Sequence, residues 1–203
     1  MSSLKDIIIS RTRVEVLEAF FSRPDKPMYV RELTRFIKGE INSVRRELER
    51  LLACGLLKSD ERGNRIYYLL NDRYLFFQEI QQMIVKCVGL GLKIRKFRRK
   101  LGELHFVMFS GRFARKLSPL RDEVDMLIVG DVVLPELEVL IKEEQAQLGR
   151  ELNYAVFSTD EFEFRKTRRD PFVMEILYNS RVMIIGSEDE LVKRTVPGLA
   201  SPV

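Results

Sequence analysis

Phe-Ser-Gly-Arg-Phe-Ala-Arg-Lys-Leu-Ser-Pro-Leu-Arg-Asp-Glu-Val-Asp-Met-Leu-Ile-Val-Gly-Asp, residues 109–131, indicates how the second half of the chain is built. A glycine turn at Gly111 leads into a short helical pattern, and Glu123 and Asp125 stand at the mouth of an apolar strand over 126–129. Acids beside a glycine turn suit a site for phosphate and its metal ions. The plain alternative is a solvated turn before a buried strand.

The stretch resembles the nucleotidyltransferase fold of the DNA polymerase beta superfamily, in particular its minimal bacterial and archaeal members. That family has glycine-serine, an aromatic residue and alanine-arginine-glycine, followed later by aspartate-x-aspartate and an apolar strand. The positions that fit the pattern are Gly111, Phe113, Ala114, Arg115 and Asp125. The positions that depart from it are Arg112 in place of the serine, Lys116 in place of the closing glycine and Glu123 in place of the first aspartate.

The resemblance implies chemistry with two Mg²⁺ ions, which bridge the acids and a nucleoside triphosphate. Glu123 and Asp125 would be the metal ligands and catalytic acids if the domain is active. The third acid of the family falls on Asn153, and a neutral amide cannot serve as a base. Glu151, expected on the same strand face, is the candidate substitute.

The cations around the glycine turn suggest a second function for this site, which is binding phosphate without a metal ion. Phosphate can be held without metal by a helix start and nearby positive charges. The candidate nucleotide- or phosphate-binding residues are Gly111, Arg112, Arg115 and Lys116. Alternatively these cations lie on the surface and face Asp122 and Glu123.

The first 70 residues read as three helices and a hairpin. Apolar periodicity predicts helices at 11–22, at 31–38 and after Asn42, which is expected to cap the third. Gly55 is expected to end that helix in the left-handed conformation. Strands over 56–60 and 65–69 flank a turn at 61–64.

This part resembles winged-helix regulators of the ArsR and MarR type. The resemblance is carried by Tyr29-Val30-Arg31-Glu32-Leu33, Ser43-Val44-Arg45-Arg46-Glu47-Leu48, Gly55-Leu56 and Tyr67-Tyr68-Leu69-Leu70-Asn71. It implies binding to double-stranded DNA, with the third helix in the major groove. The candidate contacts are Ser43, Arg45, Arg46 and Arg50 on that helix and Arg62, Asn64 and Arg65 on the wing. Alternatively the helix arginines pair with Glu47 and Glu49 on its surface.

Charge separates the halves, since residues 1–100 hold 22 lysines and arginines against 12 acids, and residues 101–203 hold 13 against 18. The halves are therefore expected to have different partners. No apolar run is long enough to span a bilayer and no signal core precedes the first charges, so we expect a cytoplasmic protein without a membrane partner. Cys54 and Cys87 are expected as reduced, buried thiols, and the single histidine, His105, argues against zinc sites and histidine triads.

The segment from Tyr74 to Lys100 is predicted as one long helix, and the resemblance to the winged-helix regulators implies that it pairs with its copy in a homodimer. Its basic end, 93–100, is predicted as a solvated, partly disordered linker, and the alternative is a source of added phosphate contacts. Beyond it, apolar strands alternate with helical patterns, which predicts a mixed sheet with helices against it. The predicted class is α+β. The predicted divisions are 1–72, a winged-helix DNA-binding domain; 73–101, a linker or dimerisation helix; 102–195, a nucleotidyltransferase-like domain; and 196–203, a flexible tail.

Three functions remain open on these residues. The first is a transcriptional regulator whose second domain is an inactive nucleotidyltransferase fold used for ligand sensing or partner binding, with no certain cofactor. The second is an active Mg²⁺-dependent enzyme that transfers a nucleoside monophosphate from a nucleoside triphosphate. The third is an antitoxin-like protein that represses its own operon.

Overall fold

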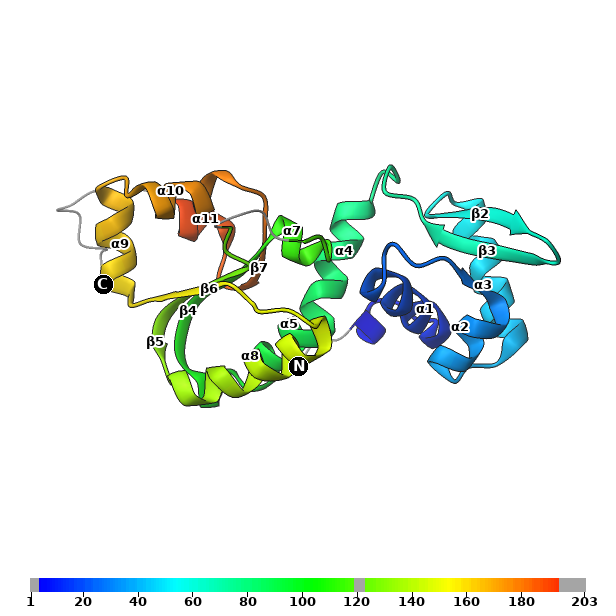
Figure 1. Ribbon diagram of the computed structural model, residues 1–203, viewed down its shortest axis with the longest axis horizontal. Coiled ribbons are helices and arrows are strands. Elements are labelled where there is room, and N and C mark those ends of the chain that lie inside the picture. Colours follow the sequence, from blue (N-terminus) through cyan, green and yellow to red (C-terminus); the bar gives the residue numbers. More distant parts are fainter. Residues whose placement is uncertain (1–3, 119–122, 194–203) are drawn as a thin grey trace. The chain divides into compact units, whose positions relative to one another are not determined.

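Residues 4–118 and 123–193 are described by the computed structural model, and over these ranges the chain is a mixed α+β protein. It divides into two compact units, Met1–Val88 and Gly89–Val203 (Figure 1). Asp122 and the tail predicted over 196–203 lie outside the described residues. Each unit has its own buried core and is described separately.

The first unit contains the predicted helices and hairpin in the expected order, together with a short 3-10 helix and a short strand that the sequence did not predict. The elements are η1 (Leu4–Asp6), α1 (Arg11–Ser22), β1 (Met28–Tyr29), α2 (Val30–Ile37), α3 (Ile41–Ala53), β2 (Leu57–Arg62), β3 (Arg65–Leu70) and α4 (Phe77–Cys87), with sheet order β1-β3-β2. Val14, Leu33, Val44 and Leu48 are fully buried in its core. The apolar stripes of the first three helices therefore meet one another, as amphipathic helices must to remove those stripes from water.

Both ends of α3 are set by residues close to the predicted ones. Gly55 follows the helix with φ of +84°, as predicted. The predicted cap at Asn42 is wrong, because the helix begins at Ile41 and Glu40 caps it. The Glu40 carboxylate accepts hydrogen bonds from the backbone N–H groups of Asn42 and Ser43 at 2.8 and 2.7 Å. These bonds lower the pKa of Glu40.

The hairpin is longer and its turn tighter than predicted. Its pairing runs from Leu57 opposite Leu70 to Arg62 opposite Arg65. Only Gly63 and Asn64 remain for the turn, and Gly63 has φ of +59°, a conformation that glycine adopts without steric cost. The two candidate wing arginines therefore face each other across the tip.

The second unit is built around a four-stranded sheet. Its elements are α5 (Gly89–Lys96), α6 (Arg98–Leu101), β4 (Gly102–Ser110), α7 (Gly111–Ala114), β5 (Met126–Val132), α8 (Leu134–Leu148), β6 (Tyr154–Phe157), α9 (Thr159–Thr167), α10 (Pro171–Tyr178), β7 (Arg181–Ile185) and α11 (Glu188–Val192). The strand order is β6-β5-β4-β7; β5 and β6 are parallel, and the other pairs are antiparallel. The predicted mixed sheet is confirmed.

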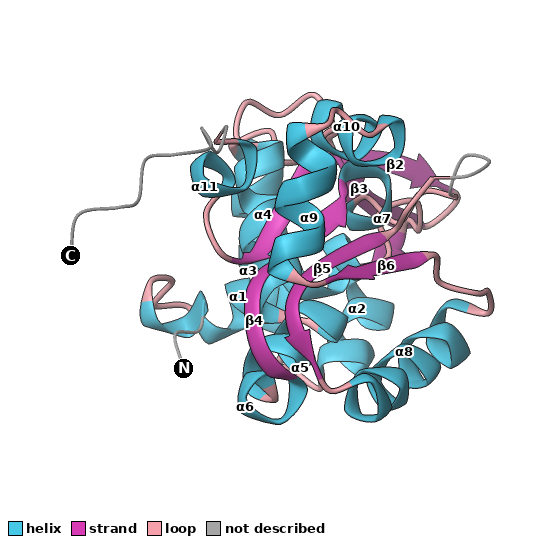
Figure 2. Ribbon diagram, turned by 90° about the vertical axis from the view of Figure 1, so that its left-hand side faces the viewer, coloured by secondary structure: helices cyan, strands magenta, loops and turns pink. Residues whose placement is uncertain are grey.

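Helices cover both faces of this sheet. Met108, Leu127 and Val129 point to one face and pack with Phe162 of α9 and Ile176 of α10. Figures 1 and 2 show α5 and α8 on the opposite side of the strands from α9 and α10. The glycine turn and the two acids lie at one end of the central strands, where β4 leads into α7 and β5 begins.

The single helix predicted from Tyr74 to Lys100 is wrong. Val88 is extended, with φ of −130° and ψ of 167°, and Gly89 has φ of +52°, so the helical segment is interrupted between α4 and α5. The boundary between the two units falls at this break. The homodimer prediction therefore loses the continuous helix on which it partly rested.

The basic run at 93–100 is not a disordered linker either. It lies in α5 and α6, with Ile94 fully buried, and Lys93 Nζ lies 2.7 Å from Glu143 Oε2 of α8. The apolar residues between the cations therefore hold the run against the second unit.

Candidate functional site

Asp125, the acid on which the enzyme hypothesis depends, is 1% exposed. Arg150 donates to both of its carboxylate oxygens, Nη1 to Oδ2 at 2.7 Å and Nη2 to Oδ1 at 2.9 Å. The backbone N–H of Asn153 donates to Oδ2 at 3.1 Å. Hydrogen bonding to Asp125 raises the pKa of the Arg150 guanidinium above its ordinary value. Asp125 is thus the buried anion of a two-point ion pair.

Glu123 also lies against an arginine. Its Oε2 is 3.2 Å from Arg112 Nε, and Arg112 donates from Nε and Nη2 to the carbonyl oxygen of Ser118 at 3.1 and 2.7 Å. The side-chain amide of Asn153 donates to the Glu123 carbonyl oxygen at 3.2 Å. The structure therefore places Asn153 beside both acids, as the resemblance implies, but as a donor to each of them.

The backbone and side chains around the glycine turn bond and pack against other residues of the chain. Ser110 caps α7 by accepting from the N–H of Phe113 at 3.2 Å, and the N–H of Gly111 donates to the carbonyl oxygen of Ser180 at 2.6 Å. A Cβ at Gly111 would overlap the Oγ of Ser180 and lie 2.9 Å from its Cβ. Close packing against Ser180 thus accounts for the glycine.

The remaining candidate phosphate ligands gather at the same turn, and each is engaged within the chain. Arg115 Nε donates to the Gly111 carbonyl oxygen at 3.1 Å. Lys116, with φ of +58°, has its Nζ 3.7 Å from Glu144 Oε1 and 5.3 Å from the centre of the Phe113 ring. Glu144 is only 3% exposed, so this lysine neutralises a buried acid.

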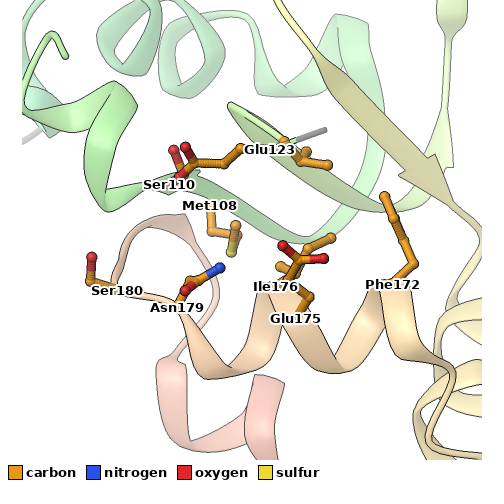
Figure 3. A pocket seen from close by; sticks show the side chains of 9 residues that line it. Met108, Ser110, Glu123, Phe172, Glu175, Ile176, Asn179 and Ser180 are labelled. Carbon is orange, nitrogen blue, oxygen red and sulfur yellow. The ribbon is translucent and has the colours of Figure 1, made fainter. Parts of the chain in front are cut away.

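A small pocket lies beside Glu123 and Ser110 (Figure 3). Glu175 and Asn179 line the opposite wall, so two carboxylates contribute to one pocket. Its volume of about 20 Å³ holds roughly one water molecule. Pockets for ligands larger than a few atoms measure about 300–1,000 Å³. A nucleoside triphosphate does not fit this pocket as the side chains stand.

The residues present do not fit a pair of magnesium ions. Arg150 occupies both oxygens of Asp125, and Arg112 lies against Glu123. The prediction that Glu151 shares a strand face with Asn153 is wrong, because β6 begins at Tyr154 and Glu151 is an exposed residue of the preceding loop. Within residues 4–118 and 123–193, no group of three His, Cys, Asp or Glu side chains is placed to hold a metal.

In the first unit the candidate DNA contacts of α3 are exposed or half-buried. Arg46 Nη2 donates to Ser43 Oγ at 3.3 Å. Arg50 Nη1 donates at 3.2 Å to Glu47 Oε1, and the Glu47 side chain is 6% exposed. Arg46 therefore makes a long hydrogen bond to a half-buried serine, whereas Arg50 is partly committed to a buried carboxylate.

A groove of about 550 Å³ lies between α2, α3 and the hairpin. Its cationic lining comes from Arg31, Arg35, Arg45 and Arg65, and Glu49 is the acid that faces them. Arg31 and Arg35 are not among the contacts that the sequence predicted. Their spacing of four residues on a short helix, which places them on one face, was the available signal.

The hairpin contributes its own polar and aromatic groups. Asn64 lines the groove, and Arg65 lies over the ring of Tyr29, 4.8 Å from its centre. Arg62 bonds Asp60 at 2.7 Å and lies 5.4 Å from the centre of the Tyr67 ring. Stacking on tyrosine limits the freedom of both guanidinium groups, and the charge of Arg62 is in addition paired with Asp60.

No family model and no curated protein matches this chain. Among solved structures, human N-acetylserotonin methyltransferase in complex with SAM aligns with a TM-score of 0.30 and 9% identity, over 49% of this chain and 33% of that chain. So weak a likeness carries no inference about fold or function. In the described part of the chain, no helix combines the length and apolarity that crossing a membrane requires.

The two cysteines are free. The prediction of buried thiols is wrong for Cys54, which is exposed because it caps the end of α3, where its Sγ donates to the Leu51 carbonyl oxygen at 3.3 Å. Cys87 is half-buried.

Proposed function

We propose that the chain is a DNA-binding transcriptional regulator with a winged helix-turn-helix in its first unit. The observation that carries the proposal is the groove with four arginines against one acid between α2, α3 and the hairpin. DNA presents a regular line of phosphates, and arginine forks bind phosphate oxygens in two-point contacts. A groove of this charge suits one sugar-phosphate strand.

In this arrangement α3 would enter the major groove. Its exposed face carries Arg45 and Arg46, and arginine makes two-point contacts to guanine edges. The hairpin tip, with Arg62, Asn64 and Arg65, would lie on the neighbouring phosphates or in the minor groove. Arg31, Arg35 and Arg65 would fix the position on DNA through phosphates, and Arg45 and Arg46 on α3 would read its sequence.

For the second unit we propose a nucleotidyltransferase-like fold without transferase activity, used for ligand sensing or for binding a partner. The supporting observation is the Arg150–Asp125 pair. The resemblance assigns a metal ion to the Asp125 carboxylate, and in this chain the guanidinium of Arg150 binds it instead. An active transferase would have to break this buried pair and open the adjacent 20 Å³ pocket.

The DNA proposal is tested by fluorescence anisotropy with a labelled duplex from upstream of the gene, over a range of salt concentrations. We expect affinity that falls with salt and is lost or strongly weakened in Arg45→Ala and Arg46→Ala. Arg11→Ala is the matched control, because Arg11 is an exposed arginine of α1 outside the groove. Absence of binding at low salt would remove the proposal.

The second unit is tested by incubating the full chain with labelled ATP, CTP, GTP and UTP and with magnesium or manganese. We expect no transfer of label to protein or to small acceptors. Transfer that disappears in Asp125→Asn, with folding verified by circular dichroism, would instead establish the active enzyme.

A further inference from the structure

A second groove in the first unit, formed by η1, α1, α3 and α4, is mostly apolar. Its volume is about 610 Å³, within the range of small-molecule sites. The wall is mostly aliphatic, with Leu17, Leu51, Leu56, Ile80, Met83 and Ile84 among its residues, and Tyr74 adds one aromatic ring. Ile7, at its rim, is 72% exposed, so the apolar surface continues outward.

Two polar residues of this groove, Ser10 and Arg13, bond the same buried carboxylate. Ser10 Oγ donates to Glu47 Oε1 at 2.9 Å, and Arg13 Nε donates to Glu47 Oε2 at 2.8 Å. The Arg13 side chain is 36% exposed, whereas that of Glu47 is 6% exposed. The Arg13 bond to Glu47 is made through Nε, so its Nη groups carry further donors at the groove.

The charges of this cluster favour an anion. Arg13 lines the groove and shares Glu47 with Arg50, so Glu47 offsets only part of the positive charge of Arg13. An apolar wall that ends at an arginine matches a molecule with an aliphatic body and an anionic head. Met83 in this wall is flexible and can adapt its shape to an aliphatic chain.

We propose that this groove binds a small amphipathic carboxylate, with its aliphatic chain along α1, α3 and α4 and its head group on Arg13 and Ser10. The head group would bind Arg13, which also donates a hydrogen bond to Glu47 of α3. Binding would therefore change how α3 is anchored to α1. This regulatory consequence rests on the proposed DNA-binding function, whereas the binding itself does not.

The test is calorimetric titration of the full chain, without DNA, with octanoate and with octanol. These probes share an aliphatic chain and differ in the carboxylate. We expect octanoate to bind about tenfold more tightly, the contribution of one charge-assisted contact. Arg13→Gln should reduce octanoate binding to the level of octanol, and the control Arg11→Gln should leave it unchanged.

A second variant examines the apolar wall independently of Arg13. Met83→Trp fills the groove from a half-buried position and should weaken both probes. Equal affinity for the two probes, or octanoate binding that survives both Arg13→Gln and Met83→Trp, overturns the proposal. It is also overturned if sedimentation shows a dimer that Met83→Trp dissociates, because the groove would then hold a second copy.

Measuring DNA binding in the presence of octanoate tests the regulatory role of the site separately from ligand binding. We expect octanoate to change the affinity for labelled DNA in the wild-type chain and not in Arg13→Gln. Octanoate binding without any effect on DNA affinity overturns the coupling and upholds the site. Octanoate binding by a chain that binds no DNA at all upholds the site and rejects the proposed function.

Discussion

The guanidinium of Arg150 and the carboxylate of Asp125 form a two-point pair, with N–O distances of 2.7 and 2.9 Å. Asp125 is buried at the start of β5, and Arg150 follows the helix α8 that leads away from the same strand. A carboxylate removed from water needs a counter-charge, and here the chain supplies it. The pair therefore stabilises the second unit and at the same time occupies the ligand atoms that a metal would need.

Arg150→Ala is expected to destabilise the protein. Among the residues that the structure describes, it leaves Asp125 buried with the Asn153 N–H as its remaining hydrogen-bond donor. Removing one member of a buried pair costs about 3–5 kcal/mol, and the 28% exposure of the Arg150 side chain places the expected loss near the lower end. Urea denaturation measures it. Arg11→Ala, which removes an exposed i,i+4 pair, should change stability much less, and equal losses in the two variants would contradict the buried-pair account.

The partner of Asp125 could not be predicted from the sequence. Arg150 is 25 residues away, in a loop that begins where Gly149 ends α8 with φ of +68°. Helix periodicity and strand alternation are local patterns, so they predicted α1, the hairpin and the mixed sheet. Which cation meets which acid depends on tertiary packing, and the motif alone suggested a metal instead.

The role of Gly111 also depends on tertiary packing that the sequence does not reveal. The sequence placed Gly111 among the candidate phosphate-binding residues. In the structure the space that a side chain would fill is taken by Ser180 of the loop before β7. Both uses demand glycine, so the residue type alone does not distinguish them.

Gly111→Ala is expected to cost about 1–3 kcal/mol through overpacking against Ser180. The double variant Gly111→Ala, Ser180→Gly removes the overlapping Oγ and Cβ and should recover part of the loss. The Ser180 carbonyl oxygen remains 3.0 Å from the point that the alanine Cβ would occupy, and this contact limits the rescue. Thermal denaturation of the two single variants and the double variant measures the coupling. Strictly additive effects would show that the two residues do not meet.

Glu47 should make stability depend on pH in the acid range. Burial alone would raise the pKa of Glu47, but hydrogen bonds from Arg13 and Ser10 and the charges of Arg13 and Arg50 outweigh it, so the pKa lies below its ordinary value of 4.5. The unfolded chain then takes up the proton at a higher pH than the folded one. The contribution is complete above pH 4.5 and is lost as the pH falls through the folded-state pKa.

The measurement is urea denaturation of wild type and Glu47→Gln at a series of pH values from neutral to acid. Wild type should lose stability more steeply than Glu47→Gln below pH 4.5. If stability falls with pH equally in the two proteins below pH 4.5, Glu47 has the same pKa in the folded and the unfolded chain.

The salt dependence of DNA binding should distinguish the groove arginines from Arg50. Each phosphate contact adds about 0.9 to the slope of log K against log salt. Arg31→Ala and Arg35→Ala should each lower the slope by about that amount, because both side chains are exposed along the groove. Arg50→Ala should lower it less, since the Arg50 guanidinium is partly committed to Glu47. Anisotropy titrations at several salt concentrations give the slopes. Unchanged slopes in Arg31→Ala and Arg35→Ala, with a large drop in Arg50→Ala, would place the phosphate strand outside the groove and along the far side of α3.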